Sequence, residues 1–183
     1  MDKLLKNMTL TFLGVLLVLT FVDATYSKYI AANKVSENNA NVAKFGTVEL
    51  KEHEVKYENG MYVINKESLT KSGNKYDYVI PGVDIAKDPF VFISGTFGVS
   101  CELYVKIVKN SFPETITFSI REDNWAPVIG ETDTYKYKNE IKLNEDLNQD
   151  VYILEDNKLI VSQYYQGSGG FELTFSAWIQ QCL

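Results

Sequence analysis

Histidine and arginine are nearly absent, since His53 and Arg121 are the single examples of each among 183 residues. One histidine cannot supply a histidine-rich zinc site, and the sequence contains no HExxH or GxSxG motif. The glycine-rich residues 167–170 lack the Lys-Ser/Thr pair of a phosphate-binding loop. Basic residues are dispersed and the net charge is −6, so we expect no nucleic-acid partner. The sequence therefore predicts a protein that is not an enzyme and needs no cofactor.

His53 is the one residue around which a histidine-based catalytic or metal site could be built. It lies between Glu52 and Glu54, but in an extended strand both glutamates point to one face and the imidazole to the other. A zinc site needs three or four ligands that converge on the ion. We therefore predict that His53 lies on a solvated strand edge and that the protein has no metal site.

Two acidic stretches raise the question of calcium. Residues 144–150 form one, and Asp77, Asp84 and Asp88 form the other. Neither has the ligand spacing and final glutamate of an EF-hand loop. We interpret both as solvated turns, with a loose calcium site as the alternative.

Long apolar runs are also lacking, apart from one near the start of the chain. Residues 8–22 carry no charge and follow Lys3 and Lys6, which is typical of a secretory signal peptide. The run is shorter than the ~20 residues that a membrane span needs. Small residues then permit cleavage after Ala24 or after Ser27. We predict a secreted protein that is not held in a membrane after processing, with an uncleaved anchor as the alternative.

The next segment, residues 28–44, is polar, rich in asparagine and weakly patterned. This pattern predicts a flexible leader or a loosely held edge strand. From Phe45 onward, short stretches of apolar–polar alternation are separated by turn residues. No repeat or obvious linker interrupts residues 45–183, so we predict one domain there.

Alternating residues define the strands of this domain. About nine or ten short strands predict an all-β fold, either an antiparallel β-sandwich or a jelly roll. The dipeptide Asn59-Gly60 favours a type I′ turn inside a hairpin. The predicted elements are a hairpin over 55–64, strands over 76–80, 89–94, 99–108, 116–120, 135–137 and 171–179, and a second hairpin from 151–154 and 158–161. Residues 139–150 are the best helix candidate, with a loop as the alternative.

The chain has two cysteines, Cys101 and Cys182. An exported protein could join them in a disulfide. Strand parity argues against this, because Cys101 alternates with the apolar face of its strand and Cys182 with the polar face of the last strand. Cys101 is then expected to be a buried, unreactive thiol.

Two aromatic residues fall on polar strand faces. Tyr104 and Trp178 each alternate with residues that are expected to point inward. Such residues can pack across neighbouring strands or under a covering segment, or they can mark a surface that binds a partner or a carbohydrate. An exported binding or adhesion module is therefore an alternative function.

Several stretches together resemble the TasA/camelysin family of exported proteins from Gram-positive bacteria. Residues 24–50 are similar to the signal-peptide end and first strand of that family, and residues 79–93 to its Pro-Gly segment followed by Lys-Asp-Pro and a strand. Residues 123–141 resemble its tryptophan followed by a Tyr-x-Tyr strand, and residues 171–181 its closing strand. The pieces occur in the family's order over nearly the whole chain.

The resemblance implies a jelly-roll domain that is processed by a SipW-type signal peptidase and assembles into extracellular biofilm fibres. The leader of one subunit would complete the sheet of the next. Such a contact joins two different surfaces of the subunit, so it can repeat without closing and yield filaments. The expected partners are copies of the same chain, with other matrix proteins as an alternative. Some relatives are described as metalloproteases, but a single histidine without a zinc signature disfavours that activity here. The apolar leader residues that would serve self-assembly are Tyr29, Ile30, Val35 and Val42.

Overall fold

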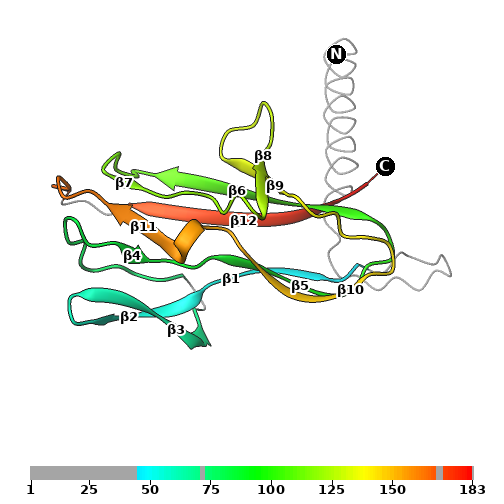
Figure 1. Cartoon of the computed structure of the whole chain (residues 1–183), viewed down its shortest axis with the longest axis horizontal. Coiled ribbons are helices and arrows are strands. Elements are labelled where there is room, and N and C mark those ends of the chain that lie inside the picture. Colours follow the sequence, from blue (N-terminus) through cyan, green and yellow to red (C-terminus); the bar gives the residue numbers. More distant parts are fainter. Residues whose placement is uncertain (1–44, 71–72, 168–170, 183) are drawn as a thin grey trace, which may run out of the picture. The chain divides into compact units, whose positions relative to one another are not determined.

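The computed structural model describes residues 45–70, 73–167 and 171–182 (Figure 1). Within them the fold is all-β, with twelve strands and one short 3₁₀ turn, so the predicted fold class is confirmed. No helix in the described part of the chain is long and apolar enough to cross a membrane. Predictions that lie outside the described residues are those for the signal peptide, for cleavage after Ala24 or Ser27, and for Tyr29, Ile30, Val35 and Val42.

The strands number twelve instead of nine or ten because several of them are only two or three residues long. In chain order they are β1 (Thr47–Lys51), β2 (His53–Glu58), β3 (Met61–Leu69), β4 (Ile85–Ala86), β5 (Phe90–Thr96), β6 (Cys101–Asn110), β7 (Ile116–Thr117), β8 (Trp125–Pro127), β9 (Thr134–Tyr137), β10 (Asp146–Tyr152), β11 (Lys158–Val161) and β12 (Glu172–Gln181).

Two antiparallel sheets form the main layers of the sandwich in Figure 1. One has the strand order β12-β6-β9-β8 and the other β1-β5-β10. A third sheet, β4-β11-β7, lies at one end, where β11 pairs with both of its neighbours. The hairpin β2-β3 forms a separate two-stranded sheet.

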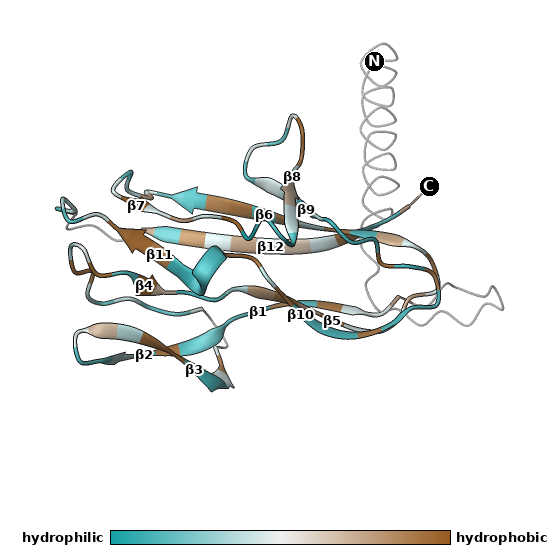
Figure 2. Ribbon diagram, in the orientation of Figure 1, coloured by the Kyte–Doolittle hydropathy of each residue, from teal (hydrophilic) through white to brown (hydrophobic). Residues whose placement is uncertain are grey.

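Alternation along β6 fills the core as predicted. Cys101, Leu103 and Val105 are 0% exposed, whereas the residues between them are not buried. Figure 2 shows hydrophobic residues along β6 and β11. The predicted hairpin is also confirmed, since Asn59 and Gly60 both have positive φ angles, 52° and 83°, between β2 and β3.

The predicted strand over 76–80 is wrong, because these residues form no ladder. The backbone N–H of Tyr78 donates to the hydroxyl of Tyr62 at 2.9 Å. The hydroxyl of Tyr76 donates to the carbonyl of Ala86 at 3.0 Å. The alternating tyrosines therefore reflect packing against the hairpin and not strand pairing.

The second predicted hairpin is also wrong. Residues Glu155–Asn157 form a 3₁₀ turn, and the strands on either side enter different sheets: β10 pairs with β5, and β11 with β4 and β7. Asp156 and Asn157 have positive φ angles of 50° and 52°, so the turn was correctly located. Turn chemistry does not say which strands pair across it.

Residues 139–150 are neither a helix nor simply a loop, because β10 begins at Asp146. As an edge strand with many exposed side chains, β10 shows little apolar alternation in the sequence.

Candidate functional site

The open side of the sandwich lies between β1 and β12. β1 pairs with β5 and β12 pairs with β6, and among the described residues neither has a second hydrogen-bonded neighbour. The two strands are nevertheless in contact with each other across the layers. Two sheet edges with unpaired backbone groups therefore occupy the same side of the molecule.

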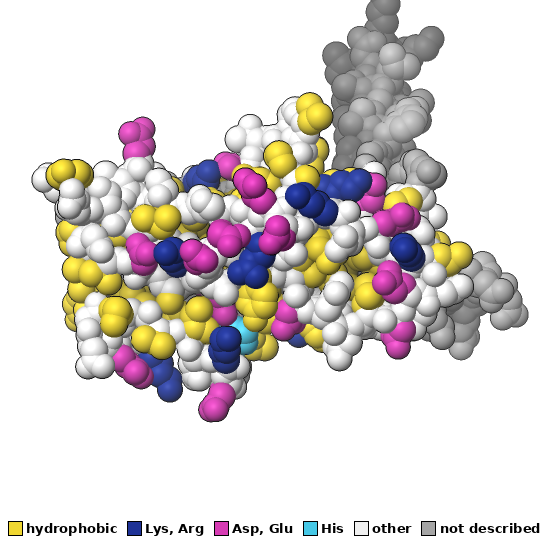
Figure 3. All heavy atoms as spheres, viewed as in Figure 1, with side chains coloured by type: hydrophobic (Ala, Val, Ile, Leu, Met, Phe, Trp, Pro, Cys, Tyr) yellow, Lys and Arg dark blue, Asp and Glu magenta, His cyan; other side chains and the backbone are white. Residues whose placement is uncertain are grey.

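Inward-facing side chains on this side are poorly covered. Phe175 and Ile179 of β12 lie opposite Ile107 and Leu103 of β6. The β6 partners are 2% and 0% exposed, whereas the β12 residues are only partly buried against the core. Leu50 of β1 is in phase with the core-packed Val48 but is 40% exposed. Figure 3 accordingly shows hydrophobic side chains that reach the surface between the two layers.

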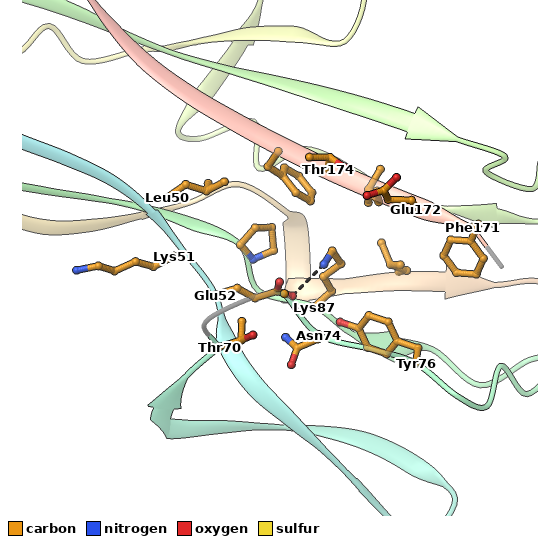
Figure 4. Close-up of a pocket in the computed structure, with 15 residues that line it drawn as sticks. Leu50, Lys51, Glu52, Thr70, Asn74, Tyr76, Lys87, Phe171, Glu172 and Thr174 are labelled. Carbon is orange, nitrogen blue, oxygen red and sulfur yellow. Dashed lines mark hydrogen bonds and ion pairs between the residues drawn. The ribbon is translucent and has the colours of Figure 1, made fainter. Parts of the chain in front are cut away.

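A pocket of about 390 Å³ lies at one end of this side, where β1 ends and β12 begins (Figure 4). Its apolar lining includes Leu50, Phe171 and Phe175. The pocket also contains the ion pair of Lys87 Nζ with Glu52 Oε1 at 3.0 Å, whose side chains are 7% and 12% exposed. The result is an open pocket with aromatic residues in its lining and one largely buried ion pair.

Aromatic rings surround the ammonium of Lys87. Its Nζ lies 5.7 Å from the ring centroid of Tyr76 and 5.6 Å from that of Phe175, within cation–π range. Burial, together with the nearby carboxylates of Glu52 and Asp88, raises the pKa of Tyr76 far above its ordinary value. Tyr76 therefore remains a neutral phenol at every physiological pH.

A second pair of side chains, His53 and Asp88, lies near the pocket. His53 Nδ1 lies 2.7 Å from Asp88 Oδ2, and the backbone N–H of His53 donates to Asp88 Oδ1 at 3.2 Å. The imidazole also stacks on Phe90 with ring centroids 5.1 Å apart. The predicted solvated edge for His53 is wrong, and so is the predicted solvated turn for Asp88, which is 1% exposed. The cause is the antiparallel register of β1 and β5, in which Lys51 pairs with Phe90. Continued by two residues along each chain, this register brings His53 next to Asp88.

Asn74 holds the chain where β1 passes into the hairpin. Its Oδ1 accepts from the backbone N–H of Val55 at 2.9 Å, and its Nδ2 donates to the carbonyl of His53 at 2.7 Å. The N–H of Thr70 donates to the carbonyl of Glu52 at 3.0 Å. Asn74 and Lys87 could not be identified from the sequence, because a polar loop residue carries no local signal for a partner 19, 21 or 35 positions away.

The pKa of Asp88 has a measurable consequence. Burial raises it, and the hydrogen bonds and charge of His53 only partly oppose that effect. A carboxyl whose pKa is raised in the folded state contributes stability at low pH, and this contribution is lost as the pH rises through the raised value. We predict that the unfolding free energy of the protein, relative to that of Asp88→Asn, falls as the pH increases above about 3.9, the ordinary aspartate value. Urea denaturation of both proteins from pH 3.5 to 7 measures this difference; a flat or rising difference would contradict it.

The acidic residues considered for calcium are dispersed. Asp84 pairs with Lys158 at 3.1 Å, Asp77 is exposed, and part of 144–150 lies in β10. Among residues 45–70, 73–167 and 171–182, no group of three or more His, Cys, Asp or Glu side chains is placed to hold a metal ion.

Both cysteines are free in the structure. Gln181 and not Cys182 lies opposite Cys101, and the N–H of Cys182 donates to the carbonyl of Ser100 at 2.9 Å. Burial raises the pKa of both thiols, which lowers their reactivity as thiolates.

Tyr104 and Trp178 are direct cross-strand neighbours whose rings stack at 5.5 Å with an 11° interplanar angle. The Tyr104 hydroxyl donates to Glu102 Oε2 at 2.6 Å, and Lys136 pairs with the same carboxylate. The hydrogen bond to Glu102 raises the pKa of Tyr104 to about 12. Contacts within the sheet thus account for both aromatic residues. On the face of the molecule drawn in Figure 3, acidic and basic side chains are interspersed.

In comparisons with known proteins, no family model, no characterised protein and no solved structure matches the chain. The relation to the TasA/camelysin family therefore stays a prediction.

Proposed function

We propose that the mature protein is a secreted structural subunit that self-assembles by strand addition into extracellular matrix fibres. In this proposal the leader, residues 28–44, of one copy pairs with the free edge of β1, on the side that faces β12, in the next copy. The domain would then be a jelly roll of the TasA/camelysin type, completed in the fibre by its neighbour.

One observation carries the proposal: inward-facing apolar residues of both edge strands remain partly exposed along a single side of the sandwich. Leu50, 40% exposed, is the clearest case. A strand added to the free edge of β1 would cover part of this surface and satisfy unpaired backbone groups of that edge at the same time. Covered apolar surface contributes roughly 25 cal/mol per Å².

The geometry of such addition favours fibres. The leader directly precedes β1, whereas the surface that would receive it lies between β1 and β12, so donor and acceptor are different parts of the molecule. A heterologous contact of this kind repeats without closing unless the rotation between copies happens to close a ring.

The test is electron microscopy and sedimentation of the secreted protein, after N-terminal sequencing has located its first residue. We expect fibres from the unaltered chain and only monomers after deletion of residues 28–44, with the far-UV circular dichroism unchanged. A matched control replaces residues 28–44 with a Gly/Ser segment of equal length, which keeps the reach of the leader but removes its apolar residues. An unaltered protein that stays monomeric at all concentrations and pH values would refute the proposal.

A further inference from the structure

We infer that Tyr29 of an incoming leader fills the pocket at the end of β1 and the start of β12, and that the leader therefore runs antiparallel to β1. This inference rests on the proposed function and names the anchoring contact and the strand direction within it.

The chemistry of the pocket suits an aromatic ring with a polar tip. Tyr76, Phe171 and Phe175 line it with aromatic rings, and the Lys87–Glu52 pair supplies charge. An ammonium has three N–H donors, and the hydrogen bond of Lys87 to Glu52 uses one of them. A phenol entering the pocket could pack its ring on the aromatic lining and accept a hydrogen bond from Lys87.

Tyr29 is the sole aromatic residue between positions 28 and 44. The other apolar leader residues, Ile30, Val35 and Val42, are aliphatic and cannot accept a hydrogen bond. A pocket of about 390 Å³ is also larger than a valine or isoleucine side chain would fill. Among the leader residues, Tyr29 is the best match to both the size and the polarity of the pocket.

The position of the pocket sets the direction of the added strand. The pocket lies at Leu50–Glu52, the end of β1, and at Phe171–Phe175, the start of β12. With Tyr29 seated there, the rest of the leader extends toward the start of β1, so it lies antiparallel to β1 and parallel to β12. From Tyr29 to Phe45 an extended chain spans about 50 Å, more than the roughly 33 Å of a ten-residue strand such as β12. The leader is therefore long enough to follow the whole open side and still reach its own domain.

Substitutions of Tyr29 test the anchor through the critical concentration for fibre formation. We expect Tyr29→Ala to raise it about tenfold or more, as loss of a buried aromatic anchor does. Tyr29→Phe keeps the ring and should show a clearly smaller rise. Ser36→Ala, the control at a polar leader position of the opposite parity, should change it less than threefold. Intact mass of each secreted variant verifies that cleavage is unaltered; a mature chain that begins after Tyr29 would overturn the inference.

Disulfide trapping tests the location of Tyr29. Thr174 lines the pocket and is exposed (Figure 4). With Cys182→Ser as the background, one tagged copy carries Tyr29→Cys and a differently tagged copy carries Thr174→Cys. We expect a covalent product containing both tags, at least about fivefold more abundant than with Ile30→Cys, because a disulfide needs Cβ atoms about 4 Å apart.

The outcomes separate this inference from the function on which it rests. Fibres that form normally with Tyr29→Ala, without the mixed disulfide, overturn the pocket assignment and leave strand addition standing. A further sample carries Tyr29→Cys and Thr174→Cys in one chain. If the disulfide forms only within that chain and never between copies, the leader closes its own sandwich and the inference is overturned. Absence of fibres from the unaltered protein overturns the proposed function itself.

Discussion

Asp88→Ala is expected to lower the free energy of unfolding by about 3 kcal/mol, among the largest effects of a single substitution outside the apolar core. The carboxylate accepts both the backbone N–H and the Nδ1 of His53 while being 1% exposed. Alanine would leave the part-buried N–H of His53 without this acceptor and the imidazole without its hydrogen-bond partner. Each such loss costs about 1–3 kcal/mol, because water cannot replace the missing group.

The measurement is urea denaturation at pH 7, with Asp84→Ala as the matched control. Asp84 also forms an ion pair, with Lys158, but its side chain is 41% exposed. Exposed pairs contribute about 0–1 kcal/mol, so the control should unfold almost as the unaltered protein does. Equal losses for the two variants would mean that the contacts of Asp88 with His53 do not stabilise the fold.

Under the proposed strand addition, Leu50→Lys is expected to abolish fibre formation, with a rise in critical concentration of about thirtyfold or more. Leu50 points inward from β1 yet is 40% exposed, so a lysine there can extend its ammonium into solvent while the domain stands alone. A strand added over this position would bury that charge without a partner, which is costly. Folding should therefore tolerate the change, with a loss of roughly 1 kcal/mol, whereas assembly should not.

Glu49→Lys is the matched control, since it introduces the same charge on the outward face of the same strand. The Glu49 side chain is 50% exposed and forms an ion pair with Lys51, so its replacement should have little effect on folding or on assembly. Sedimentation measures assembly and urea denaturation measures folding. Normal fibres from Leu50→Lys would exclude the side between β1 and β12 as the receiving surface.

The sequence alone was sufficient for features that depend on a few neighbouring residues. The all-β class followed from period-two alternation, as in β6, where alternate residues are 0–2% exposed. The β2–β3 turn followed from Asn59-Gly60, because these residues tolerate the positive φ angles that the turn requires.

Only the tertiary structure decided which strands pair and which polar residues meet. His53 and Asp88 are 35 positions apart, as are Glu52 and Lys87, and no local pattern links the members of either pair. The turn at Glu155–Asn157 was visible in the sequence, but the separation of β10 and β11 into different sheets was not. The open side of the sandwich is a further example, since alternation assigns Leu50 and Phe175 to the inward face but cannot say whether a further strand covers them. The reason is physical: periodicity reports the direction of a side chain from its own backbone, whereas burial and hydrogen bonding depend on what the rest of the fold places in front of it.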